Sequence, residues 1–156
     1  MSRDHRNLRV FHEAHAITLA IYRHSKNFPR DEWFGLRSQM RRAAVSIPSN
    51  LVEGSARRTT REYLNFLNVA RASASELSYL VRLSFELNFL SRDARDSLLP
   101  DSERLTAGLE GLLQRIEILE SLEDRSTRKR RYRKPARTIV QGLSHRRKPR
   151  AASRKP

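Results

Sequence analysis

Apolar residues recur every three or four positions through most of the chain, and no segment alternates with a period of two. The pattern covers residues 7–24, 32–54, 60–88 and 92–120, and it is typical of amphipathic helices. In the last range the repeat is regular, with a seam formed by Leu105, Leu109, Leu112, Ile116 and Leu119. Short polar connections separate the four ranges. The pattern therefore predicts an all-α fold, an antiparallel up-down-up-down four-helix bundle.

Individual residues mark where these helices begin and end. The sequence Phe28-Pro29 is expected to end the first helix, because the residue before a proline avoids the helical conformation. Asp31 is then expected to cap the second helix. Thr59 and Glu62 have the spacing of a capping box, which predicts that the third helix starts at residue 60.

Two prolines lie inside the predicted helices. Pro48 has no N–H group to donate to the carbonyl of Ala44, four residues earlier. The apolar face keeps its phase across Pro48, so we expect a continuous but kinked helix in which another group satisfies that carbonyl. A helix that breaks and restarts at Pro48 is the alternative. Pro100 leaves a break in the fourth helix open as well.

Positive charge is concentrated at the C-terminus. Residues 125–156 contain 14 of the 32 Lys and Arg residues and none of the 17 Asp and Glu residues, so they carry almost all of the net charge of +15. Like charges at this density, with few apolar residues, predict disorder. The chain is therefore divided into an N-terminal extension (1–6), a four-helix bundle (7–123) and a disordered Arg/Lys-rich tail (124–156).

The remaining composition narrows the class of protein. There is no cysteine, and the first ten residues, MSRDHRNLRV, are polar and charged, so neither disulfides nor a secretory leader is expected. No apolar run reaches the roughly 18 residues that a membrane span needs. The expectation is a cytoplasmic protein that does not enter a membrane and that carries no metal or other cofactor.

A polar stripe runs beside the apolar face of the second predicted helix, and the third helix offers a matching pair of polar residues. The set is Gln39, Ser46, Asn50 and Glu53 on the second helix, and Ser73 and Glu76 on the third. Polar groups next to a core need hydrogen-bond partners, so this set predicts a structural network that fixes the register of the two helices. A ligand contact, or a catalytic carboxylate pair of Glu53 and Glu76, is the alternative.

Three segments carry a resemblance to a known family: AIYRHSKNFP, EWFGLRSQMRRAAVSIPSNLVEG and ARRTTREYLNFLNVARASASEL. Together with the Leu-rich fourth helix they resemble the ribosomal RNA intervening-sequence proteins, which also include the accessory protein of diversity-generating retroelements. The resemblance covers about residues 7–120 and implies a four-helix bundle that assembles as a homopentamer with a central channel, without a catalytic motif. This chain has Leu51-Val52 where Ile-Ala is usual, and the family does not share its basic tail.

Two groups of basic residues are candidates for binding RNA or another nucleic acid. Phosphates attract such residues without regard to base sequence, and the tyrosine of the tail offers a ring for stacking. The tail group is Arg128, Lys129, Arg130, Arg131, Tyr132, Arg133, Lys134, Arg146, Arg147, Lys148 and Arg150. The second group, expected around the end of the second helix and the following loop, is Arg41, Arg42, Arg57, Arg58 and Arg61.

The favoured function is therefore a non-enzymatic, oligomeric bundle that binds nucleic acid. One alternative is an interaction scaffold or adaptor for a polymerase-like partner such as a reverse transcriptase. The other is a helical RNase, since Arg6 and His12 are spaced loosely like the arginine–histidine motif of the HEPN ribonucleases. His12 and His15 are three residues apart, which is not the spacing of a zinc-binding helical pair.

Overall fold

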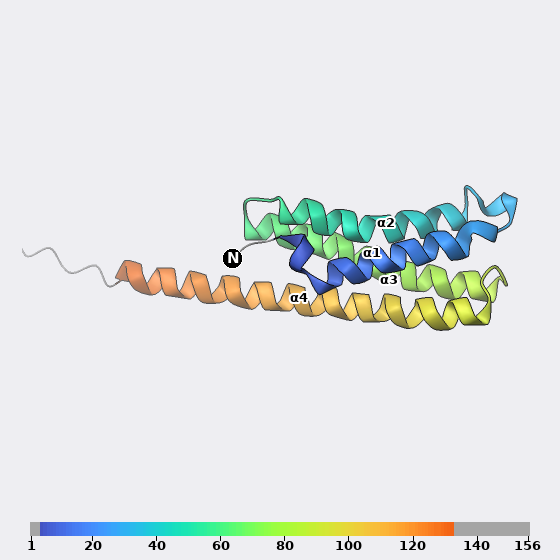
Figure 1. Cartoon of the computed structure of the whole chain (residues 1–156). Helices are drawn as coiled ribbons and strands as arrows, with labels where there is room; N and C mark the ends of the chain where they lie inside the picture. Colours follow the sequence, from blue (N-terminus) through green and yellow to red (C-terminus); the bar gives the residue numbers. More distant parts are fainter. Residues whose placement is uncertain (1–3, 133–156) are drawn as a thin grey trace, which may run out of the picture.

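The computed structural model describes residues 4–132 of the chain and the side chains of residues 4–127. Four α-helices account for most of this range: α1 (Arg9–His24), α2 (Leu36–Ser55), α3 (Thr60–Glu86) and α4 (Arg92–Tyr132). Short 3-10 turns precede and follow α1: η1 (His5–Asn7), η2 (Ser25–Asn27) and η3 (Arg30–Glu32). Successive helices run in opposite directions and lie side by side (Figure 1), which confirms the predicted up-down bundle.

The core is formed by the apolar stripes of all four helices. Within residues 4–127, twenty-three hydrophobic residues are buried, and on α1 and α2 they recur at the spacing of three and four that the sequence pattern predicts. On α3 the buried residues follow the same spacing and include the fully buried Leu67, while Leu87, just after the helix, is exposed. On α4, Leu105 and Leu109 of the predicted seam are buried, Leu112 and Ile116 are partly buried, and Leu119 is exposed.

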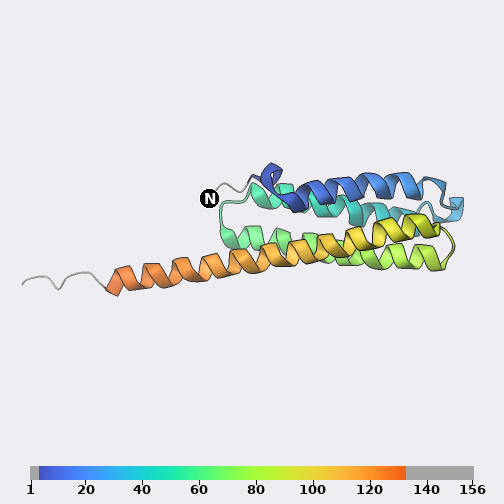
Figure 2. The same ribbon diagram turned by 60° about the horizontal axis from the view of Figure 1, so that its bottom comes forward.

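The exposure of Leu119 follows from the length of α4. The helix continues without interruption through Pro100 to Tyr132, beyond the ends of the other helices (Figures 1 and 2). Ile118, Leu119 and Leu122 lie on this overhang, which we define as residues 117–132, and all three are exposed. The predicted boundary at residue 124 is therefore wrong for residues 124–132. Arginine and lysine favour helix, and positive charge is favourable near a helix C-terminus, so the overhang does not need a core.

The capping residues were predicted in part. The capping box of α3 is confirmed, with the Glu62 amide donating to Thr59 Oγ1 and the Thr59 amide donating to a carboxylate oxygen of Glu62. Asp31 does not cap α2, because the chain makes a 3-10 turn there and α2 begins only at Leu36. Instead Glu32 Oε2 accepts a hydrogen bond of 2.8 Å from the Leu36 amide, so the cap is supplied from one residue further along.

Helix α2 is continuous through Pro48, as predicted, and the carbonyl that the proline leaves without its helical donor has found another one. Thr18 on α1 places its hydroxyl oxygen 2.8 Å from the carbonyl oxygen of Ala44. The same hydroxyl lies 2.7 Å from the carbonyl of Ala14, so its single proton is shared between the two carbonyls. Ala44 is completely buried, so its carbonyl has no access to water. The Thr18 contact therefore ties α1 to α2 at the point where α2 lacks one of its own hydrogen bonds.

Replacing Thr18 by valine is expected to lower the free energy of unfolding by about 1–3 kcal/mol, the cost of leaving a buried carbonyl unpaired. Denaturant unfolding followed by circular dichroism measures the change. Thr106→Val is the matched control. The hydroxyl of Thr106 donates to the carbonyl of Ser102, four residues earlier in the same helix, and in the described part of the chain it ties no second helix to α4. In a Pro48→Ala background, residue 48 regains its amide and the cost of Thr18→Val should shrink. An equal cost in both backgrounds would contradict this role of Thr18.

Candidate nucleic-acid interface

A basic groove opens where the end of α1, the segment after η3 and the first half of α2 meet. Its volume is about 600 Å³. We call it the basic groove and define it by its lining residues, which are Tyr22, Trp33, Phe34, Arg37, Ser38, Arg41, Arg42, Val45 and Ser46. The arginines come from successive turns of α2 and the three aromatic residues come from α1 and the linker, so the fold gathers both kinds of side chain on one surface.

Arg41 is held in place by three contacts with the end of α1 and its following turn. Its Nε donates to Ser25 Oγ at 2.9 Å, and one terminal nitrogen donates to the Tyr22 carbonyl at 3.2 Å. The guanidinium carbon also lies 4.5 Å from the centroid of the Tyr22 ring. A guanidinium has five N–H donors, so the remaining donors are free to face a ligand. Arg41 is therefore preorganised with part of its hydrogen-bonding capacity unused.

Arg37 stands beside Arg41 and contacts the neighbouring aromatic ring. Its guanidinium carbon lies 5.0 Å from the centroid of the Trp33 ring, and that of Arg30 lies 6.0 Å from it. Trp33 Nε1 donates a hydrogen bond of 3.4 Å to the carbonyl of Phe28. These contacts orient the indole at the rim of the groove, with cations close to it.

The electrostatics of the groove favour an anion. Across residues 4–127, no acidic side chain forms an ion pair with Arg37, Arg41 or Arg42. Partial burial and the nearby Arg37 lower the pKa of Arg41 from its usual value. A guanidinium is always charged, so both effects mean that Arg41 carries a positive charge at an energetic cost that a bound phosphate would relieve.

The five arginines predicted on the body do not form one cluster. Arg41 and Arg42 line the basic groove, whereas Arg57, Arg58 and Arg61 lie around the α2–α3 turn at the opposite end of α2. Arg57 forms an ion pair with Glu53 and lies 4.5 Å from the Phe66 ring centroid. The prediction of a single cluster was wrong because α2 extends for a further 13 residues after Arg42.

The predicted polar network exists in a reduced form. Ser46 Oγ and Ser73 Oγ are 2.8 Å apart and join α2 to α3, and Asn50 Nδ2 donates to the Ser46 carbonyl and hydroxyl. Gln39 and Glu76 are exposed and lie outside this network. Glu53 is exposed too and pairs with Arg57, so it forms no carboxylate pair with Glu76.

Close packing between α2 and α3 explains the glycine near the end of α2, Gly54. A Cβ atom on Gly54 would lie 2.9 Å from Phe66 Cβ and 3.0 Å from Tyr63 Cδ2. Gly108 makes the equivalent close approach of α4 to α1, where a Cβ would lie 2.9 Å from Val10 Cγ1. Gly111, one turn further along, makes no such approach, since nothing in the described part of the chain lies within 4 Å of its added Cβ.

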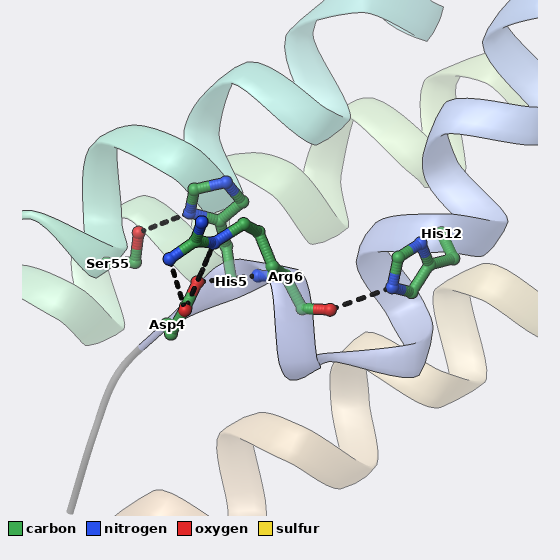
Figure 3. Close-up of polar contacts among 5 residues, drawn as sticks. All are labelled: Asp4, His5, Arg6, His12 and Ser55. Carbon is green, nitrogen blue, oxygen red and sulfur yellow. Dashed lines mark hydrogen bonds and ion pairs between the residues drawn. The ribbon is translucent and has the colours of Figure 1, made fainter.

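The proposed arginine–histidine pair does not form a joint site. The Arg6 guanidinium turns away from His12 and binds the carboxylate of Asp4, while His12 Nε2 contacts the backbone carbonyl of Arg6 at 2.8 Å (Figure 3). Hydrogen bonds from the Arg6 side chain and backbone lower the pKa of Asp4 to about 2. Next to it, His5 Nδ1 lies 3.1 Å from Ser55 Oγ and ties η1 to the end of α2. This constellation anchors the N-terminal segment.

The tail residues have a mixed outcome. Arg128, Lys129, Arg130, Arg131 and Tyr132 lie on the last turns of α4, and the others, from Arg133 to Arg150, lie outside the described residues.

Among residues 4–127, no group of three or more His, Asp or Glu side chains is placed to hold a metal ion. Within the same part of the chain, no helix is long and apolar enough to cross a membrane.

Comparison with known proteins agrees with the fold. The model of the 23S rRNA-intervening sequence protein family matches residues 6–111. The chain belongs to this family. Among solved structures, it is similar to a protein of unknown function from the S23 ribosomal protein family of Bacteroides thetaiotaomicron. That protein is 21% identical with a TM-score of 0.63, over 73% of this chain and 99% of its own. No curated protein matches the chain. The family match ends before the overhang of α4, which lies outside the shared bundle.

The aromatic residues of the groove were missed at the level of sequence. Trp33 and Phe34 are adjacent in the short linker before α2, and Arg37 follows them by one helical turn. The apolar pattern predicts a helix over residues 32–54, which includes both residues, so it does not show that they lie exposed in a linker.

Proposed function

We propose that this protein is a non-enzymatic, oligomeric helical bundle that binds RNA or another nucleic acid. The observation that carries the proposal is the basic groove, where Arg37, Arg41 and Arg42 have no acidic partner among the described residues. The Lys and Arg residues that follow α4 add phosphate affinity that does not depend on sequence. Arg58 and Arg61 are exposed at the opposite end of α2 and add further positive charge.

The test compares two triple variants of equal charge change. Arg37→Gln, Arg41→Gln and Arg42→Gln together remove the groove cations. Arg71→Gln, Arg82→Gln and Arg104→Gln remove arginines of α3 and α4 that pair with acidic residues of α4. We expect the groove variant to lower the slope of log affinity against log salt by about 2, for three lost phosphate contacts on a single strand. Fluorescence anisotropy with a labelled RNA over a salt series measures the slope.

The control triple should leave that slope nearly unchanged, because arginines that are paired with carboxylates release few counterions from RNA. Circular dichroism of both variants checks that they fold. Equal slopes for the parent and the groove variant would show that the groove does not contact RNA. If the unsubstituted protein does not bind RNA at all, the proposed function is wrong.

Assembly is the second part of the proposal. Ile118, Leu119 and Leu122 continue the apolar seam of α4 into the overhang, where no other element of the described chain covers them. Exposed apolar side chains in a row favour contact with another chain. The homopentamer that the family resemblance implies would also place several C-terminal segments on one particle and so raise the avidity for a polymer.

The same overhang favours one further candidate function, a scaffold or adaptor for a polymerase-like partner. The resemblance to the accessory protein of diversity-generating retroelements is the source of this alternative. Light scattering after size exclusion, with and without RNA, distinguishes self-assembly from a free monomer that needs another partner. A neighbouring reverse-transcriptase gene would favour the adaptor.

A further inference from the structure

Phosphate binding accounts for the arginines of the basic groove but not for its aromatic side chains. Phe34 is 95% exposed, and Trp33 and Tyr22 are close to half exposed. Three aromatic rings within one lining are a large apolar area to leave in water. Because Trp33 and Tyr22 lie beside arginines of α2, the groove suits a ligand that is both anionic and flat.

The geometry gives each group a distinct place. The carbonyl of Phe28 and the guanidinium groups of Arg30 and Arg37 hold Trp33. Phe34, its neighbour, has both ring faces almost completely accessible. Arg41 is fixed by Ser25 and Tyr22 with donors to spare. The groove therefore offers a ring for stacking and, about one and two helical turns further along, guanidinium groups for phosphates.

We propose that the basic groove binds single-stranded nucleic acid, stacking one unpaired base against Phe34 and Trp33 while Arg37, Arg41 and Arg42 contact the adjacent phosphates. This inference rests on the proposed function and specifies its substrate class. Aromatic rings beside cations are the common platform for single strands, because every base has a face that stacks. In a duplex the bases are stacked on one another, and exposing one requires it to be flipped out at a cost.

Charge argues against a twofold-symmetric contact between two copies of the chain at the groove. In a twofold-symmetric contact the same surface patch lies on both subunits, so the three arginines would face three arginines. Like charges without acidic partners repel in such an arrangement. A polyanion carries charge opposite to that of the arginines, so it is attracted to the groove.

Trp33 provides a direct test, because it is the only tryptophan in the chain. The fluorescence of the full-length protein therefore reports the groove even if the C-terminal segment also binds the ligand. The probes are a single-stranded 15-nucleotide RNA, the same RNA as a duplex, the DNA strand of the same sequence, an abasic strand of the same length, and polyphosphate. We expect saturable quenching by both single strands and little quenching by the duplex, the abasic strand or polyphosphate.

Substitution of Phe34 supplies the second measurement. Phe34→Ala is expected to weaken binding of the single strand about fivefold to a hundredfold, the usual cost of losing one stacked base, and to leave duplex binding unchanged. Phe34→Tyr should restore the affinity, since it keeps the ring. Tyr79→Ala is the matched control, because Tyr79 is an exposed aromatic residue of α3 outside the groove lining and should not affect either ligand.

Two results would overturn the inference while the proposed function survives. One is equal quenching by duplex and polyphosphate, or binding without quenching, which means that the groove or the tail responds to charge alone. The other is loss of oligomers in Phe34→Ala by light scattering with no change in single-strand preference, which means that Phe34 packs on another copy. If none of the five probes binds the full-length protein, the proposed function fails as well.

Discussion

Deleting residues 133–156 is expected to remove most of the salt-dependent part of the affinity for RNA. The deleted segment contains nine Lys and Arg residues and no acidic residue. A protein that makes six to ten phosphate contacts loses about 10³–10⁵ in affinity between 50 and 200 mM salt. The full-length chain should fall in this range, and the truncated chain, which keeps the three groove arginines and the basic residues on the last turns of α4, should lose clearly less affinity over the same interval.

The position of the truncation matters for its interpretation. Because α4 continues to Tyr132, a cut at residue 125 would remove helix as well as charge, whereas a cut after residue 132 spares the described structure. Anisotropy over a salt series gives the slopes, and the melting temperature checks that the bundle is intact. If the truncated chain kept the full salt slope, residues 133–156 would have no part in binding.

Replacing Leu109 by alanine is expected to cost about 3–5 kcal/mol, whereas the same change at Leu122 should cost under about 0.5 kcal/mol. Both residues lie on α4. Leu109 is fully buried between the helices, and Leu122 is 53% exposed on the overhang. Leucine and alanine are both good helix formers, so the difference isolates packing from helix propensity. Thermal unfolding should show a decrease in Tm of about 10–20 °C for Leu109→Ala.

The Leu122 variant also tests assembly. A large loss of stability in Leu122→Ala, dependent on protein concentration, would show that another chain covers the overhang in solution. The Tm measured at two protein concentrations about a hundredfold apart distinguishes an overhang that another chain covers from one that stays exposed to water. A loss of stability in Leu109→Ala below about 1 kcal/mol would contradict the core position of Leu109.

The fold was predictable because its signals are local. A seam at spacings of three and four, a capping box at Thr59 and Glu62, and an apolar face that keeps its phase across Pro48 each depend on residues within a few turns of one another. The need for a new partner of the Ala44 carbonyl also followed from the sequence. The identity of that partner, Thr18, did not, because it depends on how α1 packs on α2.

Other features required the three-dimensional arrangement. The seam of α4 continues in sequence to Leu119, but the partner helices end earlier, so periodicity alone does not tell where burial stops. The network of Ser46, Asn50 and Ser73 was identified, while Gln39 and Glu76 share its helical face but are exposed. The basic groove is made of three separate elements, so its aromatic members could not be assigned to one site from spacing.

The length of α4 sets a minimum size for any ligand that uses both basic regions. The groove lies at the end of the bundle where α4 begins, and the basic residues Arg128, Lys129, Arg130 and Arg131 lie on the last turns of this helix, at its far end (Figures 1 and 2). At 1.5 Å per residue, the 41 residues make α4 about 60 Å long, so these two basic regions lie near its opposite ends. A strand too short to bridge this distance gains nothing from having two sites on one chain, and a longer one binds the second site intramolecularly. Helix α4 is in this sense a molecular ruler, and plots of affinity against oligonucleotide length should show a step where the strand first spans it.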